Sequence, residues 1–327
     1  MTDELYQNLH VECLISDASL ARIQAKANKP RLFSVHWEVK TLLYIGILAL
    51  TGGLGLLVYE HIDTIGHQAI LLFIALICVG SFAYGYKKRK PFSAELVKAP
   101  NPAFDYVILL GSISMLTFLG YLQYQYNFFG TNYGLATFIP MLALFFIAYR
   151  FDHLGILSMA IANLALWMGV SVTPKKLLLN ADFDNLTIIY TYLVLGCSLL
   201  ALSIATQRYN FKKHFKFSYQ HYGIHVCYVA LLAGYFHNYD SWLAFAFVLG
   251  VGVLSVIMYL DAFRHRSFYF ILIVLLYSYV MISSLMVRLT FSVGDGALIF
   301  FLLMYFVGSA IGFIFLLMDI NKKLKAE

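Results

Sequence analysis

Charged side chains are scarce in this chain. Only 12% of its 327 residues are Asp, Glu, Lys or Arg, whereas 61% are hydrophobic. A soluble domain has about 25% charged residues and about 45–50% apolar ones. Because a soluble protein of this length must still wet its surface, it cannot bury so many apolar side chains. The composition excludes an ordinary soluble domain and indicates a protein that lies in the lipid bilayer.

A continuous basic stripe is also missing. The net charge of +6 arises from short clusters of Lys and Arg between apolar runs. A nucleic-acid-binding surface needs clustered cations on one face, commonly with aromatic residues between them. We therefore expect no nucleic-acid partner.

Signatures of metal sites and of common enzymes are absent as well. The four cysteines, Cys13, Cys78, Cys197 and Cys227, form no CxxC pair and have no zinc-ligand spacing. We expect no disulfide, no structural metal and no cofactor. Walker A, GxSxG, HExxH and GxGxxG motifs do not occur, and the loops between apolar runs are short. These absences argue against an enzyme but leave one open.

Long apolar runs fill most of the chain. A helix needs about 20 mainly apolar residues to cross the hydrocarbon layer. Such runs predict an all-α, polytopic transmembrane helix bundle of about ten spans over residues 41–318. A cytoplasmic helical segment, residues 1–40, precedes it, and a basic cytoplasmic tail, residues 319–327, follows. The predicted spans are 41–59, 68–86, 105–123, 133–149, 154–172, 186–206, 219–237, 241–260, 268–288 and 297–318.

The loop charges predict the orientation of these spans. With both termini in the cytoplasm, 20 Lys and Arg residues fall on the cytoplasmic side and 3 on the outer side. Lys and Arg are retained on the cytoplasmic side of a membrane. One missed span would invert every later loop and spoil this split. The charges therefore favour ten spans with both termini inside.

The first outer loop concentrates polar groups. It holds Glu60, His61, Asp63 and His67 within eight residues. Carboxylates and imidazoles serve as acid–base groups and as ligands of divalent cations. Turns at a wet interface are also polar without any function. The loop is a candidate site only if these side chains converge in space.

Arg288 lies at the outer end of its span, on the side that otherwise avoids Arg. A charge at that depth needs a partner. Asp295 follows in the next outer loop and Glu60 lies at a similar depth. One interpretation is a structural salt bridge between the first and last spans. The other is a clamp for an anion or substrate.

Two further stretches hold polar residues. Gln123, Tyr124 and Gln125 end the third span and are candidates for lining an entrance, although aromatic anchoring at the interface explains the tyrosine equally well. His221 and His225, one helical turn apart, have the spacing of a metal pair. A neutral, hydrogen-bonded histidine is the alternative that we favour for His225.

Several segments together resemble a known family. They are Leu14-Ile15-Ser16-Asp17, the loop at residues 60–67, Pro91-Phe92-Ser93, residues 101–106 (NPAFDY) and residues 133–140 (YGLATFIP). The chain resembles the bacterial predicted membrane proteins called domain of unknown function twenty-one fifty-seven, most clearly over residues 1–200. The resemblance implies a location in the bacterial inner membrane. It implies no substrate.

Three functions remain open. A small-solute transporter or permease would need a water-accessible cavity that leads inward from the loop at residues 60–67. A non-catalytic scaffold or sensor would use residues 1–40 to bind a protein partner. An outer-face enzyme would use the carboxylates and histidines of that outer loop. Of these, the sequence favours the transporter.

Overall fold

The computed structural model describes Glu12, Ser16, Asp17 and residues 36–60, 66–130, 132–172, 186–293 and 298–326. All regular structure in these ranges is helical, and they contain no strand. The chain divides into two compact units, Met1–Leu56 and Leu57–Glu327. The predicted helical segment at residues 1–40 lies almost wholly outside the described ranges and stays a prediction.

The described ranges hold ten α-helices, one for each predicted apolar run. They are α3 (His36–Glu60), α5 (His67–Lys88), α6 (Pro102–Tyr126), α7 (Tyr133–Phe151), α8 (Leu154–Val172), α10 (Leu186–Arg208), α11 (Lys216–His237), α12 (Leu243–Arg264), α13 (Phe268–Val293) and α14 (Leu298–Ala326); the short 3-10 helix η1 (Lys213–Phe215) precedes α11. The predicted all-α class is confirmed for these residues. The predicted basic tail at residues 319–327 coincides with the last part of α14, which continues to Ala326, and its cytoplasmic location stays a prediction.

Eight of these helices are long and apolar enough to cross a membrane. The two others are α8, whose apolar part spans only Leu154–Gly169, and α11. Polar and titratable side chains such as Gln220, His221 and His225 make α11 less apolar than its neighbours. Several helices crossing a membrane are therefore supported, whereas the count of ten crossings stays a prediction.

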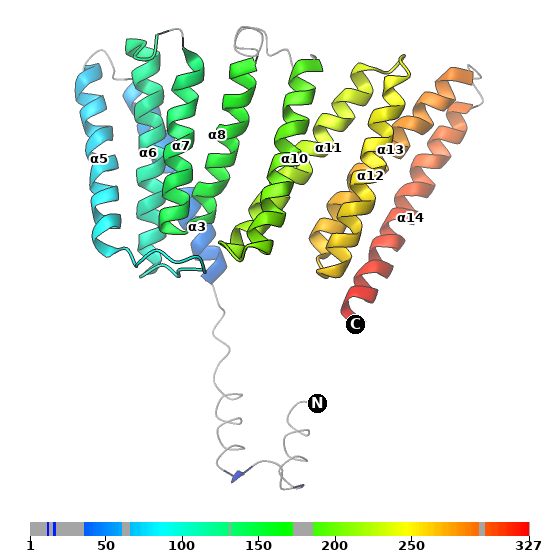
Figure 1. Ribbon diagram of the computed structural model, residues 1–327, viewed down its shortest axis with the longest axis horizontal. Helices are drawn as coiled ribbons and strands as arrows, with labels where there is room; N and C mark the ends of the chain where they lie inside the picture. Colours follow the sequence, from blue (N-terminus) through cyan, green and yellow to red (C-terminus); the bar gives the residue numbers. More distant parts are fainter. Residues whose placement is uncertain are drawn as a thin grey trace. The chain divides into compact units, whose positions relative to one another are not determined.

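In the second unit the helices from α5 to α14 stand side by side in the order of the sequence (Figure 1). Each packs chiefly on its neighbours in the chain, most extensively α11 on α10. Gly196 and Gly223 allow that approach. A Cβ on Gly196 would lie 2.8 Å from the backbone nitrogen of Cys227, and one on Gly223 would lie 3.1 Å from that of Leu200.

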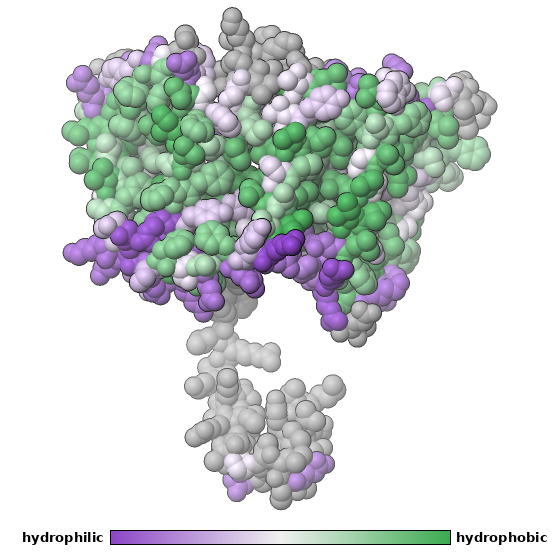
Figure 2. All heavy atoms as spheres, in the orientation of Figure 1, coloured by the Kyte–Doolittle hydropathy of each residue, from purple (hydrophilic) through white to green (hydrophobic). Residues whose placement is uncertain are grey.

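The basic loops of this unit meet at one end. Lys212, between α10 and α11, donates its backbone N–H to the carbonyl oxygen of Ala94 in the α5–α6 loop, at 2.7 Å. Lys216 Nζ lies 3.3 Å from His265 Nε2, which follows α12. Figure 2 shows hydrophilic residues along this edge and an apolar belt beside it. The loops predicted to share one side of the bilayer do share one end of the unit.

Turn residues at this end set where the helices stop. Asp152 ends α7 in the left-handed conformation, with φ of 60°, and its N–H caps Ala148. His153 then starts α8, because its Nδ1 accepts the N–H of Ile156 at 3.2 Å. Its Nε2 lies 3.2 Å from the carbonyl oxygen of Asp105 on α6. The α7–α8 turn is thus tied to the neighbouring hairpin.

Candidate functional site

The structure describes only part of the predicted outer cluster. His61, Asp63 and Asp295 lie outside the described residues. Glu60 is the last residue of α3 and is exposed. Whether the four groups of the outer loop converge therefore stays a prediction.

The other two members of the cluster have partners of their own. His67 Nδ1 lies 2.6 Å from the hydroxyl of Tyr121 and joins the ends of α5 and α6. The guanidinium of Arg288 lies 4.5 Å from the ring centroid of Tyr239 and 5.9 Å from that of Phe245. Because α5 and α13 stand far apart in the row of helices (Figure 1), His67 and Arg288 do not share a site.

The predicted entrance residues differ in their surroundings. Gln123 closes the turn after α6: its amide donates to Gly130 O at 3.0 Å and its Oε1 accepts the N–H of Phe129 at 2.9 Å. Tyr124 is 81% exposed. The groove between α5 and α6 at this end is lined mainly by apolar side chains, including those of Leu71, Phe118 and Leu122. That groove suits a lipid chain better than a polar solute.

The most continuous polar feature runs along α11, on the face that meets α12 and α13. Tyr269 OH lies 2.6 Å from His221 Nδ1. One turn on, His225 Nδ1 lies 2.8 Å from Tyr277 OH. Both histidines are therefore hydrogen-bonded, as we expected for His225.

The next turn of α11 continues the row. Tyr228 OH lies 2.9 Å from Ser255 Oγ, which lies 2.9 Å from Ser278 Oγ. Ring contacts join the three hydrogen-bonded groups. The rings of His221 and His225 meet edge to face with centroids 4.7 Å apart, and those of Tyr228 and Tyr277 stack at 4.6 Å.

We call these residues the α11 seam: His221, His225, Tyr228, Ser255, Tyr269, Tyr277 and Ser278. Positions 221, 225 and 228 lie on one face of the helix, and so does 235. Tyr235 is fully buried, and its hydroxyl has no hydrogen-bond partner. From 221 to 235 the face extends about 21 Å, against about 30 Å for the hydrocarbon layer.

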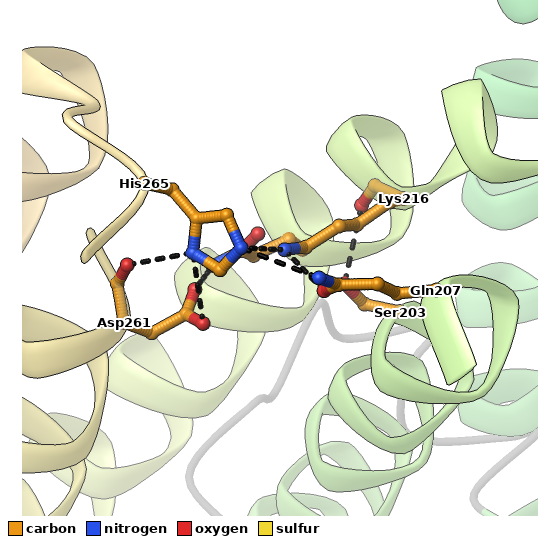
Figure 3. Close-up of polar contacts among 6 residues, drawn as sticks. Ser203, Gln207, Lys216, Asp261 and His265 are labelled. Carbon is orange, nitrogen blue, oxygen red and sulfur yellow. Dashed lines mark hydrogen bonds and ion pairs between the residues drawn. The ribbon is translucent and has the colours of Figure 1, made fainter.

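A second polar group lies at the basic end, next to the start of the seam (Figure 3). Lys216 Nζ donates to Gln207 Oε1 at 2.6 Å and lies 3.3 Å from His265 Nε2. The Nδ1 of that histidine lies 2.9 Å from Asp261 O, and Gln220 donates to Asp261 Oδ2 at 2.8 Å. This arrangement makes His265 Nδ1 the protonated nitrogen and Nε2 the acceptor. The network joins α10, α11 and α12.

A buried ion pair lies at the same end. Asp152 Oδ2 is 3.0 Å from Lys212 Nζ, and the two side chains are 2% and 1% exposed. His214 binds the other carboxylate oxygen of Asp152, and Val97 donates its N–H to Oδ2 at 2.6 Å. We call this the Asp152 cluster. It fastens the loop after α5 to two other turns.

Sequence reasoning named His221 and His225 but missed the rest of the seam and both polar groups at the basic end. Tyr269 and Tyr277 of α13 gave no signal, because their partners lie about 50 positions earlier in the chain. The amide of Asn163, a polar side chain inside α8, donates to Met159 O of its own helix at 3.2 Å. Within the described ranges no three His, Cys, Asp or Glu side chains gather to hold a metal ion.

Comparison with known proteins identifies one family. Residues 7–157 match the family described as "Predicted membrane protein (DUF2157)". The match confirms the resemblance found in the sequence over that part of the chain. No curated protein and no solved structure matches.

Proposed function

We propose that this chain, whose residues 7–157 match that family of predicted membrane proteins, is a small-solute permease of the bacterial cytoplasmic membrane and that its solute is the proton. Both termini lie in the cytoplasm in this proposal, as the loop charges favour. The α11 seam is the observation that carries it. Histidines inside membrane helices are characteristic of proton relays.

The chemistry of the seam suits a proton. Imidazole and hydroxyl groups can each donate and accept a hydrogen bond, so a proton can enter such a group on one side and leave on the other. Within each of the three hydrogen-bonded groups of the seam, the bonded polar atoms lie only 2.6–2.9 Å apart. That packing leaves no room for a larger solute between them.

The ends of the seam suggest where transfer starts and where it is slow. The network of Lys216, Asp261 and His265 lies at the basic end and offers groups that exchange protons with water. Beyond Tyr228 the face of α11 carries Leu232 before it reaches Tyr235. This gap of about 10 Å along the helix has no relay group of its own, so we expect it to limit the rate.

Proton flux into vesicles tests the proposal. The purified protein is reconstituted into liposomes that contain a pH-sensitive dye, and a potassium diffusion potential drives protons inward. We expect faster acidification than in protein-free liposomes. His225→Phe removes one relay group, which raises the barrier by at least about 1.4 kcal/mol and slows the flux at least about tenfold.

Thr191→Val is the matched control. Thr191 lies on α10, and its hydroxyl donates to Thr187 O of the same helix at 2.7 Å, outside the seam. This variant should conduct like the wild type. Wild-type protein that conducts no better than empty liposomes at either sign of the potential would refute the function. Equal flux in wild type and His225→Phe would show that the seam is not the path.

A further inference from the structure

A narrow cleft opens at the basic end of the second unit, between the loop after α5, the start of α6 and the end of α7. It encloses about 250 Å³ of space, part of it open to solvent, and its enclosed part has room for about one water molecule or one oxygen of an anion. Its lining is Arg89, Lys90, Val97, Lys98, Ala99, Pro100, Phe104, Arg150 and Phe151.

The charge of this lining has one sign. Four of the nine lining residues are cations, and none of the nine is acidic. Arg150 comes from the last turn of α7, and its Nη1 is buried without a hydrogen-bond partner. A buried donor of a charged group that lacks an acceptor is costly. The cleft thus holds a hydrogen-bond donor without an acceptor, and an anion oxygen bound there would accept its hydrogen bond.

The surrounding contacts hold the other cations in place. Lys90 Nζ donates to Lys98 O at 2.9 Å across the loop. The guanidinium of Arg89 lies 3.4 Å from the ring centroid of Tyr86, an exposed residue of α5. Asp152, two positions after Arg150, is bound by Lys212 and His214. Its charge is balanced there.

We propose that this cleft binds a phosphate oxyanion, with Arg150 holding the oxygen that enters and Lys90, Lys98 and Arg89 holding those outside. Guanidinium and ammonium groups bind phosphate through charge-assisted hydrogen bonds. The anion could come from the headgroup of an anionic lipid or from free phosphate. A lipid is the nearer source, because the apolar belt borders this edge (Figure 2). This site is independent of the α11 seam.

Native mass spectrometry of the purified protein in detergent tests the site. Phosphatidylglycerol is titrated against phosphatidylcholine, and inorganic phosphate is added in a parallel series as a competitor. We expect phosphatidylglycerol to bind and phosphatidylcholine not to bind. The variant Lys98→Gln with Arg150→Gln should bind about thirtyfold more weakly, since each cation contributes about 1 kcal/mol near an anionic headgroup.

Lys87→Gln with Lys88→Gln is the matched control, because it removes the same charge from exposed positions outside the cleft. Its affinity should not change. If Arg150→Gln lowers the thermal midpoint, Lys90→Gln with Lys98→Gln replaces it, since both lysines are exposed. Displacement of the lipid by millimolar phosphate with the same variant dependence supports the site with free phosphate as its ligand. The proposal is overturned if the control Lys87→Gln with Lys88→Gln loses as much lipid affinity as the cleft variant. Equal binding of phosphatidylglycerol and phosphatidylcholine also overturns it.

Discussion

At the scale of single residues, Asp152 and Lys212 are the clearest case of charges held away from water. Both side chains are almost fully buried, and His214 and the N–H of Val97 complete the carboxylate's contacts. A buried ion pair adds little stability compared with apolar packing, but removing one partner leaves an uncompensated charge. The intact pair therefore adds little to stability, whereas removing either of its charges lowers stability strongly.

Asp152→Asn should lower the free energy of unfolding by roughly 3–5 kcal/mol, because Lys212 would stay buried without a counter-charge. Equilibrium unfolding in mixed micelles measures the change. The control is Asp319→Asn, which breaks the pair of Asp319 and Lys323 on α14. Those side chains are 57% and 64% exposed, so little change is expected. Equal effects of the two variants would mean that the burial of Lys212 does not affect the free energy of unfolding.

At the scale of elements, the contact between α10 and α11 depends on two small residues. Gly196 faces Cys227 and Gly223 faces Leu200. Each pair is so close that a side chain on the glycine would overlap with its neighbour or press against it. The Sγ atoms of Cys197 and Cys227 lie 3.9 Å apart as free thiols in this contact. A change at Gly196 would press directly on backbone atoms, which have little freedom to yield.

Gly196→Ala should lower the free energy of unfolding by about 1–3 kcal/mol, because the new Cβ overlaps with Cys227. Gly252→Ala on α12 is the matched control. No atom lies within 4 Å of a Cβ at that position, so the better helix propensity of Ala should stabilise the protein by up to about 1 kcal/mol. Unfolding of both variants in mixed micelles gives the comparison. A stabilising effect at Gly196 would contradict the close contact seen here.

The sequence predicts the helices better than it predicts their contacts. Apolar runs mark all ten described helices, since the length of a run reflects the thickness of lipid. The ends differ where polar residues continue a helix, as α14 does to Ala326. The seam was not predictable, because residues of α11 and α13 meet only through packing. Asp152 also gave no sign of burial, because a carboxylate in a turn is usually exposed.

At the scale of the whole molecule, the number of times that the chain crosses the bilayer depends on α8 and α11. Helix α8 falls short of the other eight in the length of its apolar part, and α11 falls short of them in hydropathy. They nevertheless pack between neighbours that do, and the basic loops meet at one end of the unit. Partial shielding by protein lets α11 carry polar groups that lipid alone would not accept.

Cysteine labelling tests the ten crossings. In a chain without its native cysteines, Ser93→Cys, Tyr209→Cys and Arg266→Cys report the basic end and Asn132→Cys reports the other. An impermeant maleimide should label Asn132→Cys in intact spheroplasts, and the other three only after permeabilisation, because Lys and Arg are retained inside. Labelling of Tyr209→Cys from outside, with Ser93→Cys and Arg266→Cys protected, would leave eight crossings. Labelling of those three from outside, with Asn132→Cys protected, would reverse the orientation.

The Asp152 cluster also bears on how proteins of this kind can be shortened or recombined. The carboxylate lies within the stretch shared with the family, residues 7–157, whereas Lys212 and His214 lie beyond it. A fragment cut after the shared stretch would keep an anion whose counter-ions had been removed. In a hybrid joined at that boundary, the second protein would have to supply a cation at the turn that Lys212 occupies here. The shared stretch is therefore not an interchangeable module, even though the match to the family covers only residues 7–157.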